Sequence, residues 1–176
     1  MIEQKYWNDF YKAHKFDEPS SFAQFVIDKI DGDFVDLGCG DGRDLYFFLK
    51  NGKRGYGVDA SNEDLFIIRQ SVEAYIKENA SPDNVYTRFF WHAIPRETQK
   101  DILKWTKKHI FIEARTIKDK PKDIYGKHDR NLVDVDQLGK DLGEAGFTVT
   151  KYLEGYGMSK YFDEDPHLVR IIATKT

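Results

Sequence analysis

Apolar and polar positions along the chain predict strands and helices that alternate. Short apolar runs at 34–37, 55–58, 84–94 and 110–114 are typical of strands buried in a sheet. Between these runs, apolar residues recur every three or four positions, which is the spacing of a helix with one buried face. The predicted helices cover 21–30, 41–50, 61–79, 97–107 and a segment from 135 that ends before Gly146. Such an alternation predicts an α/β fold with a mostly parallel, doubly wound sheet.

The two ends of the chain depart from this alternation. Apolar positions within 7–14 share a helical face, and a capping-box pattern at 21–24 opens a second helix, so we expect a helical cap over 1–32. At the other end, 147–152 and 168–174 are predicted strands that pair antiparallel at one edge of the sheet. The sheet is therefore expected to hold about six strands, with an antiparallel C-terminal edge.

Composition limits the class of protein. The chain has 176 residues, which suits a single domain, and 27 basic residues against 30 acidic ones leave a net charge of -3. This near balance argues against nucleic acid as a partner. No apolar run approaches the roughly 20 residues that span a bilayer, the segment 1–11 lacks a signal-peptide profile, and the single Cys39 cannot form an intramolecular disulfide. We expect a cytoplasmic protein without a membrane partner, and leave its oligomeric state open.

The strongest local signal is the segment Asp36-Leu37-Gly38-Cys39-Gly40-Asp41-Gly42, which lies between the first predicted strand and the next helix. Glycines at such a turn permit positive φ and let the backbone approach a ligand closely. The helix that follows presents unpaired N–H groups at its start. The segment is therefore a candidate ligand loop, although a purely structural turn is the alternative.

Two features favour a ligand and indicate which one. Asp59 ends the second strand roughly 20 residues downstream, where a carboxylate can accept hydrogen bonds from ribose hydroxyls. The glycines run G-x-G-x-G instead of the dinucleotide pattern G-x-G-x-x-G, and Asp36, Asp41 and Asp44 surround them. These carboxylates would repel a pyrophosphate and suit a sulfonium or ammonium group. We therefore predict S-adenosylmethionine in preference to NAD or FAD.

The D-L-G-C-G-D-G-R segment resembles motif I of class I S-adenosylmethionine-dependent methyltransferases, and Asp59 resembles their acidic ribose-binding residue. The resemblance implies a Rossmann-like fold, with Gly38 and Gly40 against the methionine part of the cofactor. The wider pattern is similar to methyltransferases of bacterial capsule and surface-polysaccharide gene clusters. It is carried by Y-W-N-D-F-Y near the N-terminus and by the segments 88–94, 112–115 and 164–170. The expected cofactor-binding residues are Tyr11, Asp36, Gly38, Cys39, Gly40, Asp41, Arg43, Asp59, Ala60 and Phe90.

One departure from the resembled family concerns the sheet. About 25 residues separate Asp59 from Val85, which accommodates one helix but not the usual helix, strand and helix. We therefore predict that the third strand is missing and that the order, in that fold's numbering, is 2-1-4-5-7-6. Right-handed crossovers would place the 61–79 helix on the opposite face from the 41–50 helix.

Candidate catalytic and substrate residues follow the strand ends. His92 follows the fourth strand and is the first candidate for a base or a positioning group, with a packed histidine as the alternative. His128 is the second candidate, although it stands in H-D-R-N where the resembled family has H-Y-R-R. Substrate contacts are expected from His14, Glu113, Arg115 and Arg130. The two arginines could hold a phosphate or carboxylate, and an ion pair that ties strand to loop is the alternative.

These observations predict methyl transfer to a small polar acceptor. A sugar, a sugar nucleotide or a phosphorylated precursor of a surface polysaccharide is expected, and the glycan part rests on the resemblance alone. No metal site is expected, because no Cys or His cluster has ligand spacing. The alternatives are a protein or RNA methyltransferase and a noncatalytic scaffold that retains the fold; the lost strand would favour the scaffold.

Overall fold

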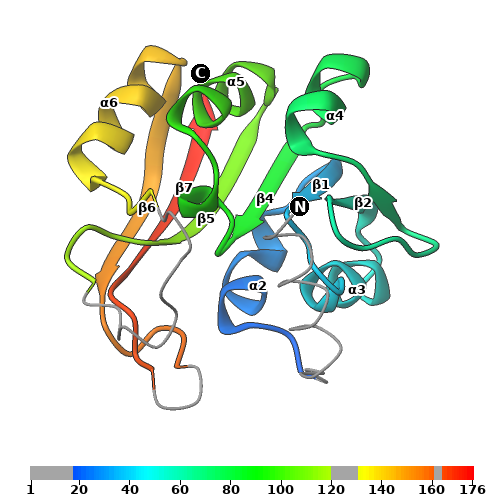
Figure 1. Cartoon of the computed structure of the whole chain (residues 1–176), viewed down its shortest axis with the longest axis horizontal. Coiled ribbons are helices and arrows are strands. Elements are labelled where there is room, and N and C mark those ends of the chain that lie inside the picture. The colour runs from blue at the N-terminus through cyan, green and yellow to red at the C-terminus, as the bar shows by residue number, and fades with distance from the viewer. Residues whose placement is uncertain (1–17, 120–130, 161–163) are drawn as a thin grey trace.

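A computed structural model of the chain describes residues 18–119, 131–160 and 164–176. Its centre is a seven-stranded sheet of order β3-β2-β1-β4-β5-β7-β6 (Figure 1). The first five strands in this order are mutually parallel, and β7 runs antiparallel to both β5 and β6. The strands are β1 Asp33–Leu37, β2 Arg54–Asp59, β3 Ile67–Arg69, β4 Asn84–Arg88, β5 His109–Arg115, β6 Phe147–Gly155 and β7 Leu168–Lys175.

Helices cover both faces of this sheet because successive side chains of a buried strand point to opposite faces. The helical elements are α2 Ser21–Val26, η1 Ile27–Lys29, α3 Arg43–Lys50, α4 Val72–Glu78, η2 Trp91–Ala93, α5 Arg96–Trp105 and α6 Val135–Glu144. In β1, Phe34 belongs to the core cluster that includes residues of α2 and α3, whereas Val35 belongs to the cluster that includes residues of α4, α5 and α6. This doubly wound arrangement with an antiparallel C-terminal edge confirms the predicted fold class.

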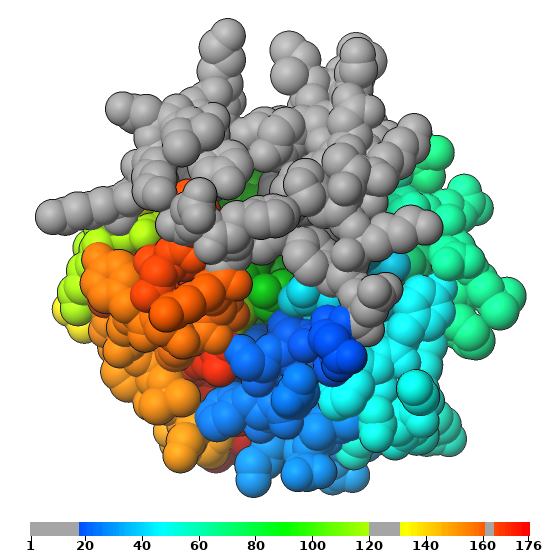
Figure 2. Space-filling view, turned by 90° about the horizontal axis from the view of Figure 1, so that it is seen from below, coloured from blue at the N-terminus to red at the C-terminus, as the bar shows by residue number. Residues whose placement is uncertain are grey.

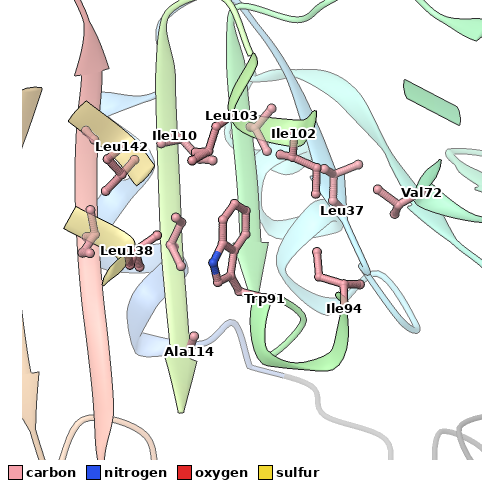
Figure 3. Close-up of a cluster of buried hydrophobic side chains, with 14 of the residues drawn as sticks. Leu37, Val72, Trp91, Ile94, Ile102, Leu103, Ile110, Ala114, Leu138 and Leu142 are labelled. Carbon is pink, nitrogen blue, oxygen red and sulfur yellow. The ribbon is translucent and has the colours of Figure 1, made fainter. Parts of the chain in front are cut away.

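The larger core lies between the sheet and α4, α5 and α6. Trp91 is fully buried there, and Figure 3 shows its ring among aliphatic side chains from the sheet and helices. A second core of mainly aromatic side chains lies under α2 and α3, where the Phe22 and Phe48 rings approach the ring of Tyr86 at 5.3 and 5.0 Å. The two cores pack against opposite faces of the strands whose carboxyl ends carry the candidate site.

The predicted loss of the third strand is wrong. Ile67 and Ile68 pair in parallel with Gly57 and Val58, so β3 extends the sheet beyond β2 and the strand count is seven rather than six. The predicted helix from 61 is correspondingly shorter: α4 begins after Ser71, whose side chain accepts a hydrogen bond from the N–H of residue 74. The apolar spacing could not separate these elements because Ile68 fits a strand and a helix equally well. The helix that does form lies opposite α3, as expected.

Two further element ends differ from the predictions. β4 stops at Arg88 instead of continuing to 94, because Phe89 turns the chain with a left-handed φ of 54° and η2 follows. At α2, Ser20 rather than Ser21 provides the N-cap. The helix expected within 7–14 lies outside the described residues. In the described part of the chain, no helix is both long enough and apolar enough to cross a membrane.

Candidate functional site

The glycine loop connects the end of β1 to the start of α3. Gly38 has a φ of 71°, and its N–H donates to the carbonyl of Val58 at 2.8 Å, which ties the loop to the neighbouring strand. A Cβ atom at Gly38 would lie 2.3 Å from the ring of Phe90. Position 38 therefore requires glycine on two counts, the left-handed backbone and the close ring. The structure thus brings together two residues of the expected cofactor set, Gly38 and Phe90.

Asp59 connects the end of β2 to the same loop. Its Oδ2 accepts the N–H of Gly40 at 2.9 Å, and its Oδ1 accepts the N–H and the hydroxyl of Ser61 at 2.8 and 2.6 Å. These donors use three of the roughly four acceptor positions of a carboxylate. Asp59 therefore ties the end of β2 to the glycine loop. Ser61, expected at a helix start, instead orients this carboxylate.

The other loop residues differ in what their side chains do. Burial, together with the nearby Asp44 carboxylate, raises the pKa of Asp36 well above its usual value, and burial also raises the pKa of Asp41. The Cys39 thiol points away from the loop surface: a Cβ atom at Gly57 would lie 2.4 Å from its Sγ, and burial raises its pKa. Cys39 therefore offers backbone rather than side chain to a ligand.

The remaining residues of the expected cofactor set flank the loop. The N–H of Arg43 donates to Asp41 Oδ1 at 3.3 Å, which closes the first turn of α3. The Arg43 guanidinium lies 3.6 Å from Asp44. Ala60 follows Asp59 directly and is exposed.

Asp44 is not directed at the loop, contrary to the expectation that it surrounds a bound cation. Its carboxylate accepts hydrogen bonds from the Ser20 N–H and hydroxyl at 2.8 and 2.7 Å and from the Tyr86 hydroxyl at 2.7 Å. Burial by itself would raise the pKa of Asp44, but Arg88, Arg43 and the Ser20 hydrogen bonds outweigh it and hold the pKa below its usual value. Asp44 thus anchors the start of α2 to the sheet.

His92 lies in η2, buried beside the end of β5. Its Nδ1 accepts the backbone N–H of Arg115 at 3.2 Å, and its ring meets the ring of Phe89 edge-on at 6.0 Å. Because an N–H can only donate, Nδ1 carries the lone pair and Nε2 carries the proton of the neutral ring. In this tautomer the Nε2–H is a hydrogen-bond donor. A role of His92 as a base would therefore require Nδ1 to release the Arg115 N–H.

Glu113 lies at the centre of a row of charged side chains, in which Glu113 and Arg170 are buried and Arg88 is partly buried. It stands opposite Arg88 of β4 and Arg170 of β7 in the sheet, and it receives a hydrogen bond from each guanidinium. The Ser159 hydroxyl donates to the same carboxylate at 3.1 Å. Arg170 also donates a hydrogen bond, from Nη2, to the Ser21 hydroxyl at 2.7 Å. Figure 2 views the molecule from the end where β4 and β5 stop. It shows α2, in blue, beside the orange segment that follows β6. We call Arg88, Glu113 and Arg170 the buried charge row.

Arg115 belongs to a separate cluster. Its Nη1 donates to Asp119 at 3.0 Å and its Nη2 to Glu164 at 2.5 Å, and all three side chains are buried. The geometry therefore matches the alternative of an ion pair that ties strand to loop. Holding an acceptor phosphate with Arg115 would require one of these ion pairs to open.

Four expected site residues, Tyr11, His14, His128 and Arg130, lie outside the described residues. Sequence reasoning missed the structural partners Ser20, Ser61, Asn62, Arg88 and Arg170. Arg88 and Arg170 begin and end segments that carry the family resemblance, which was the available signal. The pairing of Arg88 with Glu113 depends on strand register, which the sequence does not display. Within the described ranges, no group of three or more His, Cys, Asp or Glu side chains is arranged to hold a metal ion.

Comparisons with known proteins agree with this fold. A structure of magnesium protoporphyrin IX methyltransferase from Synechocystis PCC 6803 with bound SAM covers 99% of this chain and 80% of that protein, at 15% identity and a TM-score of 0.63. The 1,6-didemethyltoxoflavin N1-methyltransferase from Burkholderia thailandensis, with S-adenosylhomocysteine bound, covers 88% and 76%, at 18% identity and a TM-score of 0.66. A SAM-dependent methyltransferase from Archaeoglobus fulgidus covers 87% and 94%, at 16% identity and a TM-score of 0.63.

No protein-family profile matches the sequence, and no curated protein sequence matches it. The likeness is therefore one of structure, and at these identities it establishes the fold. The chain has the class I fold of S-adenosylmethionine-dependent methyltransferases.

Proposed function

We propose that this protein binds S-adenosylmethionine at the glycine loop and transfers its methyl group to a small polar acceptor. The observation that carries the proposal is the Asp59 carboxylate bound to Gly40 at the centre of the loop. Structural neighbours contain S-adenosylmethionine or S-adenosylhomocysteine, which supports the choice of ligand. The fold, the loop and the acidic strand end thus support one ligand class.

The residues at the loop fit this ligand. Gly38 leaves room for the Phe90 ring beside the loop, and Asp59 retains acceptor capacity for a ribose hydroxyl. Asp41 lies in the loop, and Asp36 lies in β1 directly before it. When bound, the ligand supplies a methyl group already activated by its sulfonium. The protein then has to align the acceptor and exclude water. Phe90, packed on Gly38, would form part of the wall that does so.

His92 is proposed as a base or as a positioning group, because it lies buried beside the carboxyl end of β5 with its Nδ1 held by the Arg115 N–H. His128, His14, Arg130 and Tyr11 remain proposed site residues on the basis of the sequence. The acceptor is proposed to be a sugar, a sugar nucleotide or a phosphorylated precursor of a bacterial surface polysaccharide, and this proposal rests on the family resemblance. A cytoplasmic setting is proposed from the sequence.

The scaffold alternative has lost its main support. That alternative drew on an absent third strand, and β3 is present next to β2. The hydrogen bond between Asp59 and Gly40 supports a ligand site in preference to a scaffold.

Isothermal calorimetry tests ligand binding. Wild-type protein should bind S-adenosylmethionine and S-adenosylhomocysteine with a Kd in the micromolar range, and Asp59→Ala should weaken both by about tenfold or more, since a hydrogen bond to a charged group contributes roughly 1.5–3 kcal/mol. Asp33→Ala is the matched control, because Asp33 is an exposed aspartate that pairs with Arg54. Absence of binding to the wild type at millimolar concentration would overturn the proposal.

Turnover tests the acceptor class. Methyl-donor consumption should be screened with nucleotide sugars and phosphorylated sugars as acceptors. With an accepted substrate, His92→Ala should lower kcat while leaving the Kd of the donor unchanged. Wild-type rates for this variant would remove His92 from the mechanism.

A further inference from the structure

The segment between β2 and β3 adopts a loop in place of the predicted helix, and this loop lies against the glycine loop. Two side chains hold Gly40: Asp59, the last residue of β2, accepts the Gly40 N–H at 2.9 Å, and Asn62 Nδ2 in the loop donates to the Gly40 carbonyl at 2.9 Å. A third contact joins the same loop to α3, where the Tyr46 hydroxyl donates to Asp64 at 2.7 Å.

The two contacts on Gly40 fix its backbone conformation. Its N–H belongs to the peptide plane before its Cα and its carbonyl to the plane after it, so holding both groups restrains both φ and ψ. Gly40 adopts a left-handed φ of 58°. A glycine without such restraints samples many backbone conformations and loses more entropy than any other residue when it is ordered. The hydrogen bonds with Asp59 and Asn62 therefore order Gly40 in the protein without a ligand, so ligand binding does not have to supply the entropy cost of ordering this residue.

Apolar burial does not explain how this loop is held. Leu65 is 83% exposed and Phe66 43% exposed, and Asn62 itself is only partly buried. The segment is held by the hydrogen bonds to Gly40 and Tyr46, by the Gly57 N–H, which donates to the Phe66 carbonyl at 2.8 Å, and by an edge-on contact between the Tyr46 and Phe66 rings. A loop placed chiefly by hydrogen bonds to a ligand loop is suited to positioning rather than to core stability.

We propose that Asn62 is a positioning residue for the methyl donor: it holds the Gly40 carbonyl so that the glycine loop is already in its binding conformation. Ser61 assists by orienting Asp59 through its N–H and hydroxyl. The inference rests on the proposed function, because it assigns Asn62 to the donor site. It adds a residue to that site that touches the loop rather than the ligand.

The test compares Asn62→Ala with Asn51→Ala by calorimetry with S-adenosylhomocysteine. Asn51 is the matched control, because its Nδ2 also donates to a backbone carbonyl, that of Phe47 at 2.8 Å, at the far end of α3. The expected result is a Kd about five- to tenfold higher for N62A and unchanged for N51A, since a lost hydrogen bond is worth roughly 1 kcal/mol. The melting temperatures of the two variants should agree.

A second variant separates positioning from a merely structural role. Asn62→Asp places an oxygen where the amide donor stood, so at pH 7 it should weaken binding more than N62A. At lower pH a protonated carboxyl can again donate to the Gly40 carbonyl. The ratio of the N62D to the wild-type Kd should therefore fall as the pH is lowered from 7 to about 4, near the ordinary pKa of an aspartate carboxyl, a recovery that lost folding stability would not produce.

The outcomes distinguish the two proposals. If the wild type binds S-adenosylhomocysteine and N62A binds it equally well, the role of Asn62 is refuted and the proposed function stands. If N62A melts well below N51A and the N62D ratio does not change with pH, Asn62 is structural and the inference fails. If the wild type itself does not bind, the proposed function fails first and takes the inference with it.

Discussion

The carboxyl end of the sheet is built in two different ways. On the β1–β2 side, the chain presents backbone groups and one carboxylate, Asp59, held by hydrogen bonds from Gly40 and Ser61. On the β4–β5–β7 side, the buried charge row pairs Glu113 with Arg88 and Arg170. The first half retains capacity for a ligand, whereas the second uses its charges to tie the sheet to α2 and to the segment before β7.

This difference shows why charged residues near strand ends cannot all be assigned to a substrate. Glu113 and Asp59 are both acidic and both lie at strand ends, yet Glu113 is fully buried between two guanidinium groups. A buried charge must be paired, because desolvation without a partner costs several kcal/mol. Asp59 keeps acceptor capacity, and for this reason it is the ligand contact that we propose.

The largest effect is expected from breaking the buried charge row. Glu113→Gln removes the carboxylate that both arginines share and leaves two guanidinium groups without it, so the free energy of unfolding should fall by about 3–5 kcal/mol. Urea denaturation measures this loss. Asp31→Asn, which removes an exposed ion pair with Lys108, is the control and should change stability little. Equal losses in the two variants would contradict a special role for burial.

A smaller effect is expected in the glycine loop. Gly38→Ala introduces a Cβ into the Phe90 ring at a left-handed φ and should cost about 2–4 kcal/mol, the sum of backbone strain and overpacking. Gly52→Ala has a similar φ of 77° with no atom within 4 Å of the new Cβ, so it should cost only about 1 kcal/mol. The difference between the two losses of unfolding free energy measures the cost of the contact between the new Cβ and the Phe90 ring. Equal losses in the two variants would show that the Phe90 ring moves aside.

The two buried aspartates beside the loop should respond to pH in opposite directions. Because the pKa of Asp36 is raised, the folded state binds more protons than the unfolded state above about pH 4, and the Asp36 contribution falls as pH rises toward the folded pKa. The pKa of Asp44 is lowered, so its contribution is present above about pH 4 and is lost as pH falls below that value.

Asp36→Asn isolates the first of these contributions. The stability of D36N relative to the wild type should increase as pH rises from about 4, with a slope of at most about 1.4 kcal/mol per pH unit. Denaturation at several pH values between 4 and 8 provides the measurement. A difference that stays constant with pH would mean that Asp36 titrates normally.

The smallest effect concerns Phe89, which joins the two halves. Phe89 adopts a φ of 54°, and its ring lies 4.6 Å from the Arg88 guanidinium. Phe89→Gly and Phe89→Ala both remove the ring, but only glycine relieves the backbone strain, so F89G should be more stable than F89A by about 1 kcal/mol. Thermal melts of the two variants give the comparison. An F89A variant as stable as F89G would indicate that the turn relaxes.

Much of the fold was predictable because its signals are local. The glycine loop, Asp59 and the alternation of apolar runs identified β1, α3, β2, β5 and the antiparallel edge. Only the tertiary structure revealed β3, because a three-residue strand such as Ile67–Arg69 is defined by its pairing with β2 rather than by any pattern of its own. The end of β4 was missed for a similar reason, since an apolar run continues past the turn at Phe89.

The sequence by itself identified the glycine loop and the acidic end of β2, since the turn of glycines, the helix after it and the aspartate all lie within residues 36–59. The partners of the buried charges were decided only by the tertiary structure. Arg88, Glu113 and Arg170 are far apart in the chain and meet because strand register places them side by side on one face of the sheet. Long-range pairing has no local signature, and it determines which charges are neutralised and which keep capacity for a ligand.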